Sequence, residues 1–70
     1  MQPNLLKAEM VRQGLNGQRL SAAIGISESA FYRKLNGVSE FTQGEIKAIA
    51  DTLGLGKDTI FQIFFEAEVS

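Results

Sequence analysis

The sequence predicts an all-α domain built from five short helices. No stretch alternates polar and apolar residues with the period of two that a half-buried strand requires. Glycines separate short segments in which apolar residues recur with helical spacing, and the only proline, Pro3, stands near the start of the chain. Seventy residues are enough for one small domain with a limited core, so we expect residues 1–70 to form a single domain.

A capping residue and a glycine bound each of the first two expected helices. Asn4 can cap the first helix, and Gly14 can end it in the left-handed conformation. Asn16 and Gly25 take the corresponding positions around the second helix. The residues expected to face the core are Leu6, Met10 and Val11 in the first helix and Leu20, Ala23 and Ile24 in the second.

The third helix is expected between Ser27, which can cap it, and Gly37, which follows it. At about 100° per residue, Phe31 and Leu35 fall on one side and form its core face. The opposite side carries a hydroxyl, a phenol, a guanidinium and an amide, from Ser29, Tyr32, Arg33 and Asn36. Such a side is either an ordinary solvated face or a face that contacts a partner.

The fourth helix has the clearest start, because TQGE, beginning at Thr42, fits a capping box in which hydroxyl and carboxylate each bind a backbone amide. Gly54 is placed to end this helix. Its apolar stripe consists of Ile46, Ile49, Ala50 and Leu53. The fifth helix is expected from about Lys57 to Phe65, with Asp58 in the first turn, where the helix dipole favours an anion.

The composition argues against several kinds of site. The chain contains no Cys and no His, so it lacks disulfides, thiolate metal sites and the commonest catalytic base. The carboxylates are scattered over different helices, and we therefore expect no enzyme, no metal and no cofactor. No apolar run approaches the roughly 20 residues that span a bilayer. We expect a cytoplasmic protein without a membrane or small-molecule partner.

The charge is distributed unevenly along the chain. The formal net charge is −1, which gives no general support to nucleic-acid binding. Residues 1–47 nevertheless carry six basic and four acidic side chains, whereas residues 48–70 carry one basic and four acidic side chains. The front of the chain can therefore still face phosphate.

The segment from about 16 to 36 has the layout of a helix-turn-helix. Ser21 is small enough for the two helices to approach, Gly25 supplies the turn, Ile26 fills the space beneath it and Ser27 starts the next helix. In this motif the second helix lies in the DNA major groove and reads bases mainly with its N-terminal half.

These residues resemble those of a known family. GLNGQRLSAAIGISESAFYRKLNG, which runs from Gly14 to Gly37, is similar to the phage Cro/repressor (XRE-type) helix-turn-helix regulators. IKAIADTLGLGKDTIF resembles the following helices of that family, and the whole resemblance covers about residues 5–65. It implies a compact five-helix, lambda-repressor-like domain that binds operator DNA, generally as a dimer. More narrowly, the chain resembles small regulators encoded in prophages of Gram-positive bacteria.

The resemblance also implies a set of DNA-contacting residues. It places Glu28, Ser29, Tyr32 and Arg33 at base-reading positions, and Asn16, Gln18, Asn36 and Gln43 near phosphate. Arg33 is the best candidate, because a guanidinium can grip guanine O6 and N7 with two bonds. The alternatives are phosphate contact or solvation for Arg33, and stabilisation of the helix dipole for Glu28.

Three departures from the family pattern matter. Gly17 stands where the family often has Gln, although its amide at a helix start can still face phosphate. Met10 and Leu35 stand where the family often has an ion pair, and we predict that these two apolar side chains touch. Lys34 replaces an aliphatic residue, so we expect its stem to cover the core and its ammonium to reach solvent or phosphate.

The end of the chain is unusually apolar. Within TIFQIFFEAEVS, one helix face cannot bury every large apolar side chain. One interpretation is that Ile60, Phe61 and Phe64 complete the core. The favoured interpretation is a dimer patch made of Ile60, Ile63, Phe64, Phe65 and Val69.

Together these features favour a sequence-specific transcriptional regulator, a repressor of phage or mobile-element type, that binds double-stranded operator DNA as a homodimer. The recognition helix is expected at 28–36, and the C-terminal helix and tail at about 57–70. The alternative is a protein-interaction module on the same scaffold, such as an antitoxin or an anti-repressor, which the apolar end and the net acidity would suit.

Overall fold

The structure is a computed structural model that describes residues 1–66. Within this range the chain forms helices and no strand, which confirms the predicted all-α fold. The elements are α1 (Pro3–Arg12), α2 (Gly17–Ile24), α3 (Glu28–Leu35), α4 (Gln43–Leu53), α5 (Lys57–Ile60) and η1 (Phe61–Phe65), which is a short π-helix.

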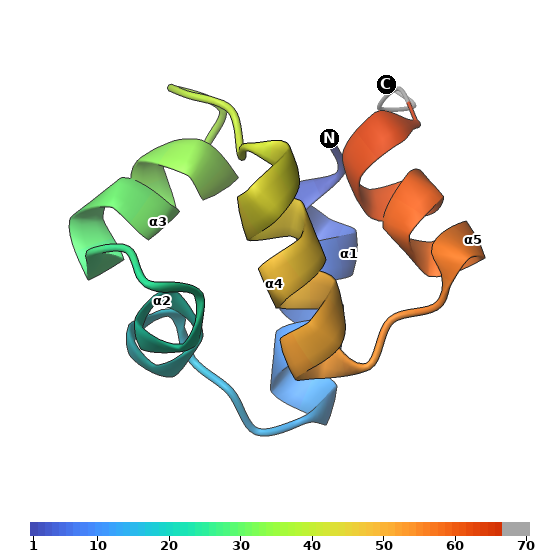
Figure 1. Ribbon diagram of the computed structural model, residues 1–70, viewed down its shortest axis with the longest axis horizontal. Helices are drawn as coiled ribbons and strands as arrows, with labels where there is room; N and C mark the ends of the chain where they lie inside the picture. The colour runs from blue at the N-terminus through green and yellow to red at the C-terminus, as the bar shows by residue number, and fades with distance from the viewer. Residues whose placement is uncertain (67–70) are drawn as a thin grey trace.

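The helices are arranged around α4 (Figure 1). α2 and α3 lie on one side of it, α5 and η1 lie on the other, and α1 passes behind it. The N-terminal end of the chain is joined to η1, because the Gln2 amide donates a hydrogen bond of 2.6 Å to the Ile63 carbonyl. The start and the end of the described chain therefore lie side by side (Figure 1).

One buried cluster holds the helices together, and every helix except α5 contributes to it. Its members are Leu6, Met10, Leu20, Phe31, Leu35, Ile49, Leu53 and Ile63. Met10 and Leu35, which stand where the family often has an ion pair, both belong to this cluster, and their direct contact stays a prediction. Partly buried residues, among them Ile26, Phe41 and Phe64, pack against it.

Most of the predicted helix ends are confirmed. The Asn16 and Ser27 side chains accept hydrogen bonds from the first turns of α2 and α3. Thr42 forms the predicted capping box at the start of α4. Gly25 and Gly54 end α2 and α4 in the left-handed conformation, with φ of 82° and 66°.

Three expectations about α1 and α2 were wrong. α1 begins at Pro3 rather than after Asn4, because proline suits the first turn of a helix. Val11 is 78% exposed, since only the Leu6 and Met10 stripe of α1 meets the core. Ala23 is exposed, because the covered face of α2 is made by residues three and four apart, namely Gly17, Leu20, Ser21 and Ile24.

Candidate nucleic-acid interface

The connection between α2 and α3 is tightly specified. Gly25 reverses the chain, and the Ile26 amide donates to the Ser21 carbonyl at 3.0 Å. Ser27 then starts α3 by accepting a hydrogen bond of 3.1 Å from the Ala30 amide. Ser21 itself is buried, and its hydroxyl donates to the Gln18 carbonyl at 3.0 Å. The small side chain at position 21 thus lies at the junction of the two helices, as the sequence predicts.

α3 has two different faces. Phe31 and Leu35 are buried in the core, as predicted. The four side chains expected to read bases are all on the exposed part of α3: Glu28, Ser29, Tyr32 and Arg33. They form two pairs spaced four residues apart, so they cover one continuous surface rather than scattered points. The structure therefore brings the predicted base-reading set together.

The residues expected near phosphate lie around this surface. Asn16 accepts a hydrogen bond of 2.8 Å from the Arg19 amide, which leaves its side-chain amide group free to donate. Gln18 is exposed in the first turn of α2, Asn36 is exposed at the end of α3, and Gln43 is exposed in the first turn of α4. None of these assignments to phosphate is tested by the structure, and they stay predictions.

Gly17 differs from the other candidates because it is buried. A β-carbon placed on Gly17 would lie 2.3 Å from the hydroxyl oxygen of Tyr32. The Tyr32 ring therefore occupies the space in which any other side chain at position 17 would begin. Tyr32 is 42% exposed, so one part of the ring covers α2 and the rest faces solvent.

Lys34 does not reach solvent as we expected. Its ammonium donates to both carboxylate oxygens of Glu45, at 2.5 and 2.6 Å, and so joins the end of α3 to the start of α4. The same carboxylate accepts from the Thr42 amide in the capping box. The Lys34 ammonium and the Thr42 amide hold the pKa of the Glu45 carboxyl below its ordinary value. A phosphate contact by Lys34 would have to compete with this pair.

This role of Glu45 is not evident from the sequence. The capping box assigned its carboxylate to the helix start, and nothing in the residue spacing indicated that Lys34 would share it. The chain thus lacks the ion pair that the family often has between the first and third helices, and it has a different ion pair, between α3 and α4.

The apolar end of the chain departs from both of its interpretations. Ile63, which we assigned to the dimer patch, is only 1% exposed and belongs to the core. Phe61, expected in the core under the other interpretation, is 57% exposed. The reason is that the face turned to the core is the one formed by Ile60, Ile63 and Phe64, three and four residues apart, and Phe61 lies outside it. η1 itself winds as a π-helix, in which the Glu66 amide donates to the Phe61 carbonyl five residues earlier.

The other members of the predicted patch divide between surface and core edge. Phe65 is 59% exposed, whereas Ile60 and Phe64 are half-buried. Val69 lies outside the described residues.

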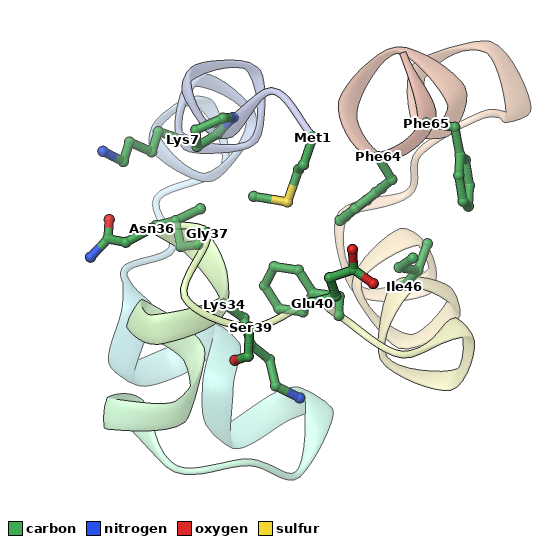
Figure 2. Close-up of a pocket in the computed structure, with 13 residues that line it drawn as sticks. Met1, Lys7, Lys34, Asn36, Gly37, Ser39, Glu40, Ile46, Phe64 and Phe65 are labelled. Carbon is green, nitrogen blue, oxygen red and sulfur yellow. The ribbon is translucent and has the colours of Figure 1, made fainter. Parts of the chain in front are cut away.

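A hollow of about 620 Å³ lies beside this segment (Figure 2). It is bordered by the N-terminal residues, the end of α3, the loop that follows it, α4 and η1. In Figure 2, Met1 and Phe64 lean toward its middle, while the polar ends of Lys7 and Asn36 turn outward. The exposed Phe65 lines the same hollow, so a protruding ring and a cavity lie next to each other.

Residues 1–66 contain neither a metal-binding cluster nor a membrane-spanning helix. No group of three or more acidic side chains is arranged to hold a metal ion there. Over the same residues, no helix has the length and apolar character needed to cross a bilayer.

The fold and the exposed face of α3 together define a small helix-turn-helix domain. A family model of the Cro/C1-type HTH DNA-binding domain matches residues 6–66, and the chain belongs to this family. The protein is thus a DNA-binding regulator, a function that needs no catalytic site. Comparison with curated proteins and with solved structures finds no match.

Proposed function

We propose that this domain is a sequence-specific repressor of phage or mobile-element type, which binds double-stranded operator DNA with α3 in the major groove. The observation that carries the proposal is the continuous exposed face of α3, with Arg33 and Ser29 on it, behind which Phe31 and Leu35 fix the helix to the core. Base edges in the major groove present the donors and acceptors that such side chains recognise.

A selection experiment tests this function. The full chain selects a preferred duplex from a random pool, and fluorescence anisotropy then compares this duplex with a shuffled one. Arg33→Ala should reduce the preference about tenfold, as expected for the loss of one base contact. Lys57→Ala, which removes one positive charge from the exposed start of α5, is the matched control and should leave the preference unchanged.

Two results would contradict the proposal: a chain that prefers no duplex, or an Arg33→Ala variant that binds like the parent. Because residues 1–47 carry only two more basic than acidic side chains, the affinity should also fall only gently with salt.

We infer further that the protein acts as a homodimer through its C-terminal surface, formed by the exposed rings of Phe61 and Phe65, of which Phe65 also lines the hollow. Two exposed aromatic rings on one short segment form an apolar patch of the kind that mediates association. A two-fold dimer would present two α3 helices to half-sites about 34 Å apart. Ile63 has no part in this surface, because it is buried.

Sedimentation velocity tests the dimer. Phe65→Ser should shift the chain toward monomer and weaken binding to the selected duplex. Val38→Ser is the control, because it replaces an exposed apolar side chain in the loop after α3. It should change neither the oligomeric state nor the binding to the selected duplex. A chain that is monomeric and selects no duplex would instead favour the protein-interaction module, with the C-terminal surface docking a different protein.

A further inference from the structure

The contact between Gly17 and Tyr32 is unusual in its closeness. A β-carbon on Gly17 would lie 2.3 Å from the Tyr32 hydroxyl oxygen, 2.5 Å from Cζ and 2.8 Å from Cε2, all below the closest approach of real side chains. Gly17 starts α2 and Tyr32 lies in the middle of α3. The ring thus forms a direct bridge between the two helices of the motif, and it fits only because position 17 has no side chain.

The same ring is held from a second direction. Tyr32 packs edge to face against Phe31, with ring centroids 5.5 Å apart and an interplanar angle of 75°. Phe31 is fully buried. One end of the Tyr32 side chain is therefore fixed by the core and the other end by α2, which leaves little freedom for the ring to follow a base.

We propose that Gly17 and Tyr32 act as one unit, in which Tyr32 is a positioning residue rather than a reader of bases. The contact sets the orientation of α3 relative to α2, and so places Arg33 and Ser29 against the DNA. This inference depends on the function proposed above and deepens it. It replaces the expectation that the Tyr32 side chain itself contacts a base.

The physical reason is the shortness of α3. An eight-residue helix held by two buried side chains, and by the Lys34–Glu45 ion pair at its C-terminal end, can still pivot at its N-terminal half. Such a pivot moves the exposed side chains by more than a hydrogen bond tolerates. A ring resting on α2 blocks that movement. Gly17 is required for it, because any β-carbon would push the ring away.

Gly17→Ala separates this positioning role from stability. The atoms that would clash are the far end of a partly exposed side chain, which can swing into solvent without disturbing the core. Ala also favours a helix more than Gly does. The unfolding midpoint should therefore not fall, while the preference for the selected duplex over the shuffled one should fall about tenfold.

A double-mutant cycle tests the coupling. Tyr32→Ala should reduce the preference for the selected duplex by the same factor as Gly17→Ala. The double variant should reduce it no further than either single variant, because both changes remove the same contact. Tyr32→Phe should keep most of the preference, because the ring atoms Cζ and Cε2, which lie 2.5 and 2.8 Å from the β-carbon position, still rest on Gly17 when the hydroxyl is removed. Gly56→Ala is the matched control, because its β-carbon would meet open space at the start of α5.

A spectroscopic measurement reports the contact without any DNA. Tyr32 is the only tyrosine, and the chain has no tryptophan, so intrinsic fluorescence comes from this ring. Acrylamide should quench the fluorescence of Gly17→Ala more strongly than that of the parent or of Gly56→Ala.

Different outcomes would overturn different claims. Two results would contradict the proposal that Gly17 and Tyr32 act as one unit. One is unchanged quenching in Gly17→Ala, and the other is a double variant in which the two losses of duplex preference add. A Tyr32→Phe variant as defective as Tyr32→Ala, with quenching like that of the parent, would mean that the hydroxyl acts on DNA and not through the contact with Gly17, which also contradicts the proposal. If acrylamide quenches Gly17→Ala more strongly but the parent chain selects no duplex, the contact between Gly17 and Tyr32 is confirmed. The DNA-binding proposal is then overturned, and the positioning role with it.

Discussion

The helix-turn-helix of α2 and α3 and the C-terminal segment of α5 and η1 are both short and apolar, yet they follow different rules. In α3 the spacing of an α-helix predicts that Phe31 and Leu35 are buried, and they are. In η1 the same spacing allows two faces, because either Ile63 or Phe61 can join Ile60 and Phe64, and the structure buries Ile63 and exposes Phe61. The difference teaches that apolar spacing predicts the buried face only where the apolar residues are few enough to form a single face.

The two regions also use their glycines and caps differently. α2 and α3 each begin with a side-chain cap, Asn16 and Ser27, which fixes where the α-helical spacing starts. α5 begins at Lys57, after Gly56, which has no side chain to cap it, and the helix changes to π geometry after Ile60. A single π turn inserted in a helix rotates everything that follows it.

Phe31→Ala should have the largest effect on stability, because it removes a fully buried ring at the centre of the core. We expect a loss of about 3–5 kcal/mol in the free energy of unfolding. Since a domain of this size has only about 5 kcal/mol in total, the variant should be largely unfolded. Urea unfolding followed by circular dichroism measures this. Phe65→Ala, an exposed ring, is the control, and similar losses for both would contradict the assigned core.

The burial of Ile63 rather than Phe61 predicts the next effect. Ile63→Ala should cost about 2–5 kcal/mol, because it empties a core position, whereas Phe61→Ala should cost well under half as much. The order would be reversed if Phe61 instead of Ile63 joined Ile60 and Phe64 on the buried face. The two urea midpoints therefore decide between the two faces, and a larger loss for Phe61→Ala would show that Phe61 lies in the core.

How far the sequence predicts the molecule depends on the range of the interaction. Caps, left-handed glycines and the α3 faces are local, and the residues that decide them are adjacent in the chain, so Ser27 and Thr42 were assigned correctly. The Lys34–Glu45 ion pair joins residues eleven apart whose meeting depends on how α3 and α4 pack. The Gly17–Tyr32 contact likewise needs the three-dimensional arrangement.

Glu45→Gln should have a moderate effect that depends on pH. The pKa of this carboxyl is lowered in the folded protein by the Lys34 ammonium, so the stabilisation is present at neutral pH and is lost as the pH falls through about 4.5, the ordinary value, and below. The variant should be about 1 kcal/mol less stable than the parent at neutral pH. The free energies of unfolding of the variant and the parent should converge in acid.

Urea unfolding at a series of pH values measures this convergence. Glu9→Gln provides the control, because Glu9 pairs with an exposed Arg12 on α1 and should contribute less. A constant difference between Glu45→Gln and the parent at every pH would show that the ion pair does not contribute to stability.

Gly44→Ala should have the smallest effect, and its sign differs from that of the others. Gly44 lies in the first turn of α4, its β-carbon would meet only the Thr42 hydroxyl at 4.0 Å, and the position is exposed. Ala should therefore stabilise the domain by about 0.4–1 kcal/mol. Two explanations fit a glycine inside this helix turn: the close approach of a DNA backbone, or drift. Anisotropy decides between them, because weaker binding to both the selected and the shuffled duplex would extend the phosphate-facing surface from α2 and α3 to α4. Unchanged binding would confine that surface to the helix-turn-helix.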